Sequence, residues 1–147
     1  MKLQFSLDLP SSPDSLIKIA TDYENLPTLL PDQLKSVKIL EQTNEQTITE
    51  ETLFFSTISK TKIRQRSLHK NISNNELKTE IIAGPAKGTV VNVKYDKIDT
   101  GTRIIVDVDL KLALKYKMIT PIIKKWYKRL LTALLYKMNN EAIIHNT

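Results

Sequence analysis

The stretch PIIKKWYKRLLTALLYKM, residues Pro121–Met138, decides the fold. Its apolar residues recur with the helical period of about 3.6 residues per turn. When positions are placed at intervals of about 100° around Trp126, several apolar residues fall within about 80° of it: Ile119, Ile122, Ile123, Leu130, Ala133 and Leu134. Lys125, Lys128 and Arg129 occupy the opposite, narrower arc. An apolar arc this broad predicts a helix held between two layers of structure, with its basic side in water.

Seven segments before this helix have the pattern of β-strands. Residues 2–9, KLQFSLDL, alternate between apolar and polar side chains, which is the period of a half-buried strand. Six further strands are predicted at Ser36–Thr43, Thr47–Phe55, Lys60–Lys70, Leu77–Ala83, Thr89–Ile98 and Thr102–Leu114. The pieces between them are short, and a parallel crossover needs roughly a dozen residues. The sequence therefore predicts a sheet of about seven antiparallel strands.

The remaining segments complete an α+β domain. PSSPDSLIKIATDY combines the Ser and Pro of a helix start with an apolar stripe, and ENLPTLLPD reads as a short turn of helix between prolines. The final helix is predicted from about Ile119 to about Ile143. At about 1.5 Å per residue it is roughly 35 Å long, the one element able to cover the apolar face of the sheet. We expect a single domain over residues 1–147.

Composition excludes several classes of protein. The 147 residues are 41% hydrophobic and 26% charged, which is typical of a globular domain. The chain has no cysteine, so disulfides, thiolate metal sites and cysteine nucleophiles are excluded. No segment approaches the roughly 20 apolar residues that cross a bilayer, and the N-terminus lacks the apolar stretch of a signal peptide. We therefore expect a cytoplasmic protein that meets any membrane from outside.

The stretch ATDYENLPTLLPDQLKSVKIL resembles part of a known superfamily. Its D-Y-x-x-x-P-x-x-L-P pattern consists of Asp22, Tyr23, Pro27, Leu30 and Pro31. This pattern and the order of elements resemble the START-like, or polyketide-cyclase (SRPBCC), superfamily, nearest the branch that includes coenzyme-Q-binding proteins. The resemblance implies a helix-grip fold, in which a curved antiparallel sheet wraps around the C-terminal helix and leaves an apolar cavity. Members bind lipids, sterols, quinones or polyketides, and some catalyse cyclisation or dehydration.

Strand alternation predicts which side chains face such a cavity. In the strand Thr102–Leu114 the apolar residues share one face and the charged residues share the other. In Lys60–Lys70 the even positions are basic, so the odd positions face inward. The predicted ligand-binding residues are Ile63, Gln65, Ser67, His69, Ile81, Val93, Tyr95, Val106, Val108 and Leu110 from the strands, and Ile122, Trp126 and Leu130 from the final helix.

The predicted inner face is apolar with a few polar members, which is the common form of a small-molecule site. The polar members are Gln65, Ser67, His69, Thr79 and Tyr95. No general base occupies a prominent position, and no His or carboxylate cluster has the spacing of a metal site. We therefore predict binding or transport of a hydrophobic small molecule (a lipid, quinone or polyketide-like compound), with no catalytic residue, metal or cofactor. The alternative is a cyclase or dehydratase that polarises a carbonyl with Tyr95, His69 or Gln65.

The positive charge of the chain lies near its C-terminus. The net charge is +6, and the segment from Lys111 onward has eight basic residues and one acidic residue. Four of them, Lys124, Lys125, Lys128 and Arg129, are candidates for contact with an anionic membrane. A third hypothesis is a membrane or nucleic-acid adaptor with a filled core. Nucleic acid is the disfavoured partner, because no aromatic residues are interleaved for base stacking. The sequence specifies no oligomeric state.

Overall fold

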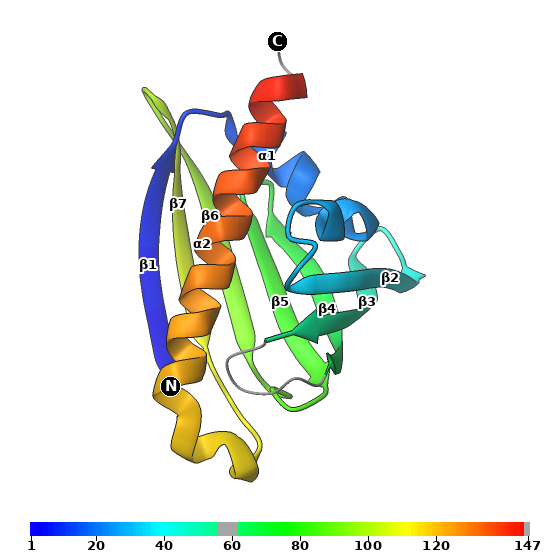
Figure 1. Cartoon of the computed structure of the whole chain (residues 1–147). Helices are drawn as coiled ribbons and strands as arrows, with labels where there is room; N and C mark the ends of the chain where they lie inside the picture. The colour runs from blue at the N-terminus through cyan, green and yellow to red at the C-terminus, as the bar shows by residue number, and fades with distance from the viewer. Residues whose placement is uncertain (56–61, 146–147) are drawn as a thin grey trace.

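A computed structural model describes residues 1–55 and 62–145 of the chain (Figure 1). The elements in chain order are β1 (Lys2–Leu9), α1 (Pro13–Ala20), the 3₁₀ helix η1 (Tyr23–Thr28), β2 (Leu34–Gln42), β3 (Gln46–Phe54), β4 (Lys62–Ser73), β5 (Glu76–Ala83), β6 (Val90–Ile98), β7 (Gly101–Asp109), the 3₁₀ helix η2 (Leu114–Ile119) and α2 (Thr120–His145). Figure 1 shows the sheet curving around α2, with α1 beside the C-terminal part of that helix.

The strands form one seven-stranded antiparallel sheet in the order β1-β7-β6-β5-β4-β3-β2. From β2 to β7, strands that follow each other in the chain pair with each other, as the short connections predicted. β1 pairs with β7, with Leu3 opposite Val108 and Leu7 opposite Ile104. The first and last strands therefore lie side by side, and β1 and β2 are the two edges. The predicted α+β helix-grip architecture is confirmed.

The last strand is shorter than predicted. β7 ends at Asp109 rather than at Leu114, and a 3₁₀ helix begins at Leu114. Both neighbouring strands run out at this point, because Asp109 is opposite Lys2 of β1 and Val90 of β6. Alternation of side chains continues past this point in the sequence, so the pattern alone extended the strand too far. The predicted fourth strand begins at Lys60, which lies outside the described residues.

The buried face of α2 is centred on a different line from the predicted one. The buried residues are Ile123, Tyr127, Leu135, Met138 and Ala142, a stripe rotated by about one residue, or about 100°, from Trp126. The predicted inward place of Ile122 is wrong, because this side chain is 52% exposed. The helix is apolar around more than half its circumference, so the sequence left the centre of the buried arc undetermined.

Buried polar contacts fix the end of β1 to the sheet and to α2. Asn139, which is 5% exposed, accepts a hydrogen bond at Oδ1 from the Ser11 amide (3.2 Å). The Ser11 hydroxyl donates to the Asn139 carbonyl (3.4 Å), and the Thr102 hydroxyl donates to the Ser11 carbonyl (2.7 Å). These bonds satisfy backbone groups that would otherwise be buried without partners. They hold the turn before α1 in place over the end of α2.

Gly101 permits the close contact between the β6–β7 hairpin and the end of β1. Its φ of 142° suits glycine, and an added Cβ would overlap the Leu9 carbonyl and the Pro10 backbone. We expect Gly101→Ala to lower the free energy of unfolding by about 2 kcal/mol or more, measured by urea unfolding. Gly88→Ala is the control, because its added Cβ meets only the flexible Lys111 side chain at 3.2 Å. Equal losses in the two variants would contradict the role of backbone overlap.

Candidate functional site

A mainly apolar cavity of about 210 Å³ lies between the inner face of the sheet and α2. Strands β3 to β7 form one wall, α2 forms another, and residues of α1, η1 and β2 close the remaining side. Most of the contacting side chains are Leu, Val or Ile. The side chains on the wall that have polar atoms are those of Tyr23, Glu51, Gln65, Ser67, His69, Thr79, Tyr95 and Tyr127. Among them, the five that are not tyrosines come from β3, β4 and β5, so the sheet has a polar sector.

The structure brings together eight of the predicted ligand-binding residues on the cavity wall: Gln65, Ser67, His69, Ile81, Val93, Tyr95, Val106 and Leu130. The others lie elsewhere. Val108 and Leu110 belong to the continuous core, since they are 0% and 3% exposed. Ile63 borders a separate space of about 20 Å³. Trp126 stacks on Phe55 with 4.0 Å between ring centroids and borders an outer groove, and Ile122 faces outward. The rotation of α2 about its axis explains why neither Trp126 nor Ile122 lies on the cavity wall.

The four predicted membrane-contact residues of α2 border two grooves. Lys124, Lys125 and Lys128 border a shallow groove beside Leu3 of β1. Arg129 borders a different groove, together with Trp126 and Leu130. Lys125 and Arg129 are four residues apart, or about 40° around the helix, so they lie on the same side of it. The basic side of α2 therefore extends over both grooves.

Glu51 on β3 is the centre of the polar sector, and the sequence analysis missed it. Its side chain is 10% exposed. The carboxylate accepts hydrogen bonds from Gln65 Nε2 (2.7 Å), the Ser67 hydroxyl (2.9 Å) and the Thr49 hydroxyl (2.9 Å). Burial raises the pKa of Glu51, while the hydrogen bonds from Gln65, Ser67 and Thr49 act in the opposite direction.

His69 is held next to Glu51 by a chain of hydroxyl groups. Its Nε2 lies 2.8 Å from the Thr49 hydroxyl oxygen, and its Nδ1 lies 2.8 Å from the Thr79 hydroxyl oxygen. The Thr49 hydroxyl donates its hydrogen to Glu51, so its oxygen accepts a hydrogen bond from His69. Nε2 of His69 therefore carries the imidazole proton, and Nδ1 accepts a hydrogen bond from the Thr79 hydroxyl. Tyr23 stacks on the imidazole with 4.3 Å between ring centroids. Burial lowers the pKa of His69 to about 4, so the ring is neutral at neutral pH.

Three tyrosines, Tyr23, Tyr95 and Tyr127, are the remaining residues with polar atoms on the cavity wall. Burial raises the pKa of Tyr23 to about 12. Burial also raises the pKa of Tyr127, and the nearby charge of Glu51 raises it further. Burial raises the pKa of Tyr95, and the nearby Tyr23 raises it further. All three phenols therefore remain protonated and uncharged.

The signal for Glu51 lay in strand pairing rather than in alternation. The strand TITEETLF is polar on both faces, because Glu50 and Glu51 are adjacent and point to opposite sides. In the sheet, Glu51 is directly opposite Gln65, and Thr49 is opposite Ser67. Both partners were predicted to face inward. Pairing the predicted third and fourth strands in register would have identified Glu51 as an inward carboxylate.

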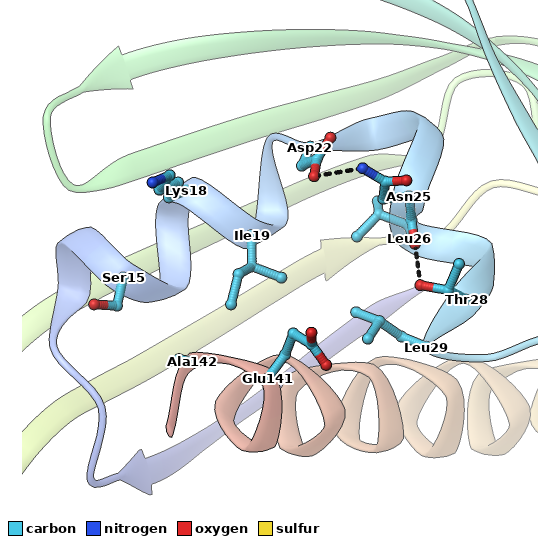
Figure 2. A pocket seen from close by; sticks show the side chains of 10 residues that line it. All are labelled: Ser15, Lys18, Ile19, Asp22, Asn25, Leu26, Thr28, Leu29, Glu141 and Ala142. Carbon is cyan, nitrogen blue, oxygen red and sulfur yellow. Dashed lines mark hydrogen bonds between the residues drawn. The ribbon is translucent and has the colours of Figure 1, made fainter. Parts of the chain in front are cut away.

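A second, outer cleft of about 640 Å³ lies between α1, η1 and the last turns of α2 (Figure 2). In it, Asn25 Nδ2 donates to Asp22 (2.7 Å), and the Thr28 hydroxyl donates to the Asn25 carbonyl (2.6 Å). These three residues are exposed, so their groups are already hydrated. Leu26 borders both the outer cleft and the inner cavity and separates them. The inner cavity is the candidate site, because its titratable groups are buried and their pKa values are shifted.

Known structures share this architecture over nearly the whole chain. An aromatase/cyclase, Zhui, from Streptomyces sp. R1128 has a TM-score of 0.85 and 10% identity and covers 100% of this chain and 96% of its own. A START superfamily protein from Mycobacterium smegmatis has a TM-score of 0.78 and 17% identity, with 96% of each chain covered. Norcoclaurine synthase from Thalictrum flavum, in complex with dopamine and hydroxybenzaldehyde, has a TM-score of 0.77 and 14% identity, covering 100% and 88%.

The chain has the fold of the START-like superfamily, which confirms the resemblance seen in its sequence. No protein-family model and no curated protein matches the sequence. A shared fold at these identities does not select an activity, because one fold supports many functions. The choice of function therefore depends on the cavity and its polar sector.

The neutral state of His69 makes stability depend on pH. Between pH 6.5 and pH 4 the unfolded chain binds the histidine proton more readily than the folded chain, so stability falls as the pH falls. Each pH unit contributes about 1.4 kcal/mol, so the full loss is about 3 kcal/mol. The raised pKa of Glu51 acts in the opposite sense, since the folded chain then binds a proton more readily.

We expect the wild-type protein to lose about 3 kcal/mol more stability than His69→Gln between pH 7 and pH 4. Both proteins contain Glu51, so the difference between them isolates the histidine. Urea unfolding at several pH values measures it. Parallel pH profiles for the two proteins would show that His69 protonates in the folded state at its ordinary pKa.

Proposed function

We propose that the protein binds a hydrophobic small molecule in the cavity between the sheet and α2. The observation that supports this most directly is the cavity itself, an apolar space of about 210 Å³ with one polar sector. Apolar walls stabilise a bound molecule by about 25 cal/mol per Å² removed from water. A few polar groups then fix its orientation. A filled core, as an adaptor would have, does not account for this space.

The size of the cavity favours a compact ligand. An apolar cavity of about 150 Å³ accepts a benzene-sized molecule. The space of about 210 Å³ therefore suits a body of one or two rings or a short branched chain. A lipid with two long acyl chains would need a much larger space. Of the classes that the sequence suggested, small aromatic or polyketide-like molecules fit best.

A cyclase or dehydratase is the second candidate function. The observation that favours it is the chain of hydrogen bonds from Glu51 through Thr49 to His69, in which a carboxylate and an imidazole share one wall of the cavity. Such a pair can accept a proton from a bound carbonyl compound or donate a proton to it. Three protein donors already occupy three of the roughly four acceptor positions of the carboxylate, however, so little of it is open to take up a substrate proton. Binding therefore remains the leading proposal.

Filling the cavity tests the proposed binding. Val93 on β6 lies on the cavity wall, and Ile105 on β7 is 39% exposed on the opposite face of the sheet. We expect Val93→Phe to lower the affinity for small aromatic probes about tenfold or more, because the added ring occupies their space. Ile105→Phe should bind like wild type. Native mass spectrometry after purification, followed by titration with a panel of one-ring and two-ring compounds, measures both; equal binding by the two variants would place the ligand elsewhere.

We also propose that the protein contacts anionic membranes through the start of α2 and the preceding 3₁₀ helix. Leu114, Met118 and Ile122 are 82%, 96% and 52% exposed. Residues 111–129 contain seven basic residues and no acidic residue. Exposed apolar side chains within a basic surface are typical of proteins that lie on a membrane. No helix within residues 1–55 and 62–145 is long and apolar enough to cross one.

The membrane contact has two separable parts. We expect Leu114→Ser with Met118→Ser to weaken sedimentation with vesicles of phosphatidylcholine and phosphatidylserine about tenfold, because both side chains lose their apolar anchor. Lys115→Gln, Lys117→Gln and Lys125→Gln together should remove the preference for vesicles that contain phosphatidylserine. The control is Lys38→Gln, Lys70→Gln and Lys97→Gln, an equal loss of charge on exposed residues of the sheet. Equal effects of the two triple variants would mean that only net charge matters.

A further inference from the structure

The charges that face the cavity are asymmetric. Of the described residues on its wall, none is a lysine or an arginine, and Glu51 is the one acid. His69, the remaining titratable nitrogen, is neutral because burial lowers its pKa to about 4. The three tyrosines stay protonated. The interior therefore holds an acid with no cation of the protein against it among the described residues, although the chain as a whole has a net charge of +6.

The carboxylate of Glu51 has one acceptor position left. An ionised carboxylate offers about four positions for hydrogen bonds. Oε2 receives Gln65 and Ser67, and Oε1 receives Thr49. His69 Nε2 lies 3.8 Å from Oε1, beyond hydrogen-bond distance, and its proton is already donated to Thr49. Among the described residues no further side chain donates to Oε1, so one position on it is free.

The surroundings of Glu51 suit a positive group. All three of its protein partners are neutral donors, so they orient the carboxylate without cancelling its charge. Folding has already removed this carboxylate from water, and an arriving cation therefore gains the attraction without that part of the desolvation cost. The tyrosine rings on the same wall attract cations with their faces. A ligand carboxylate or phosphate would instead meet a like charge at low dielectric.

We propose that the cavity selects an organic amine, with an apolar body of one or two rings and an ammonium group that donates to the free position on Glu51 Oε1. This inference rests on the proposed binding function and specifies its ligand class. Glu51 is then the residue that determines specificity, and Gln65, Ser67 and Thr49 position it. Fatty acids and phosphorylated lipids are excluded from the cavity by the same charge.

Three probes of similar size test the selection: phenethylamine, 2-phenylethanol and phenylacetate. They share a benzyl body and differ in the charge and donors of the last group. At neutral pH we expect the amine to bind about tenfold to a hundredfold more tightly than the alcohol, because a hydrogen bond between charged partners is stronger than one with a neutral donor. The carboxylate should bind most weakly. Isothermal titration calorimetry on the unaltered protein measures this order and needs no variant.

Glu51→Gln then identifies the residue responsible. It should bind the amine within about threefold of the alcohol, because the ionic partner is gone. Glu50→Gln is the matched control, since Glu50 is the adjacent residue on the outer face, where it pairs with Arg66 at 3.3 Å. This control removes the same charge and should keep the full preference for the amine. Thermal unfolding of both variants verifies that they are folded.

Two results would overturn the inference and leave the cavity function standing. One is equal affinity of the wild type for the amine and the alcohol. The other is a preference for the amine that persists in folded Glu51→Gln. If none of the three probes binds, and the panel of one-ring and two-ring compounds also fails to bind, the proposed binding function falls as well. If only phenylacetate binds, the cavity is an anion site and the sign of the selection is wrong.

Discussion

The structure depends on a mismatch of widths: the sheet has more inner face than one helix covers. Seven strands spaced about 4.8 Å apart span roughly 30 Å, whereas a helix with its side chains is about 10 Å across. α2 lies over the β1 and β7 side, where Ile104, Val108 and Ile123 form a continuous core. The inner face of β3 to β5 remains beyond its reach. Curvature of the sheet and the short helix η1 enclose that remaining face, and the cavity results.

The polar sector is a product of strand register on this uncovered face. Glu51 is opposite Gln65, Thr49 is opposite Ser67, and Thr79 is opposite His69. Most hydrogen bonds of the polar sector therefore join neighbouring strands, and Thr49 donates to Glu51 on its own strand. A shift of β4 by one residue would turn Arg64 and Arg66 inward and expose the partners of Glu51. Burying an unpaired carboxylate or guanidinium is costly, so the polar sector itself helps to select the register.

Much of this could be predicted from the sequence, because alternation and connection length are local properties. The strand 2–9 and the pairing of β2 to β7 follow from them, and so do the inward positions of Gln65, Ser67 and His69. Two features are not local. The rotation of α2 is set by which strands it touches, and the wide apolar arc around Trp126 fits several rotations. The role of Glu51 depends on its cross-strand partners, and its own strand is polar on both faces.

The outside and the inside of the molecule have opposite electrostatic character, and this separates two proposed partners. The surface around Leu114 and Met118 is basic, whereas the acid Glu51 is the only Asp, Glu, Lys or Arg among the described residues on the cavity wall. An anionic headgroup attracted to the surface is repelled from the interior, so a lipid that holds the protein at a membrane is not the molecule that enters it. Both regions use α2: Leu130 on the cavity wall follows exposed Ile122 by eight residues, about 12 Å along the helix. Membrane contact at the start of α2 would therefore act on the same rigid element that forms the cavity wall.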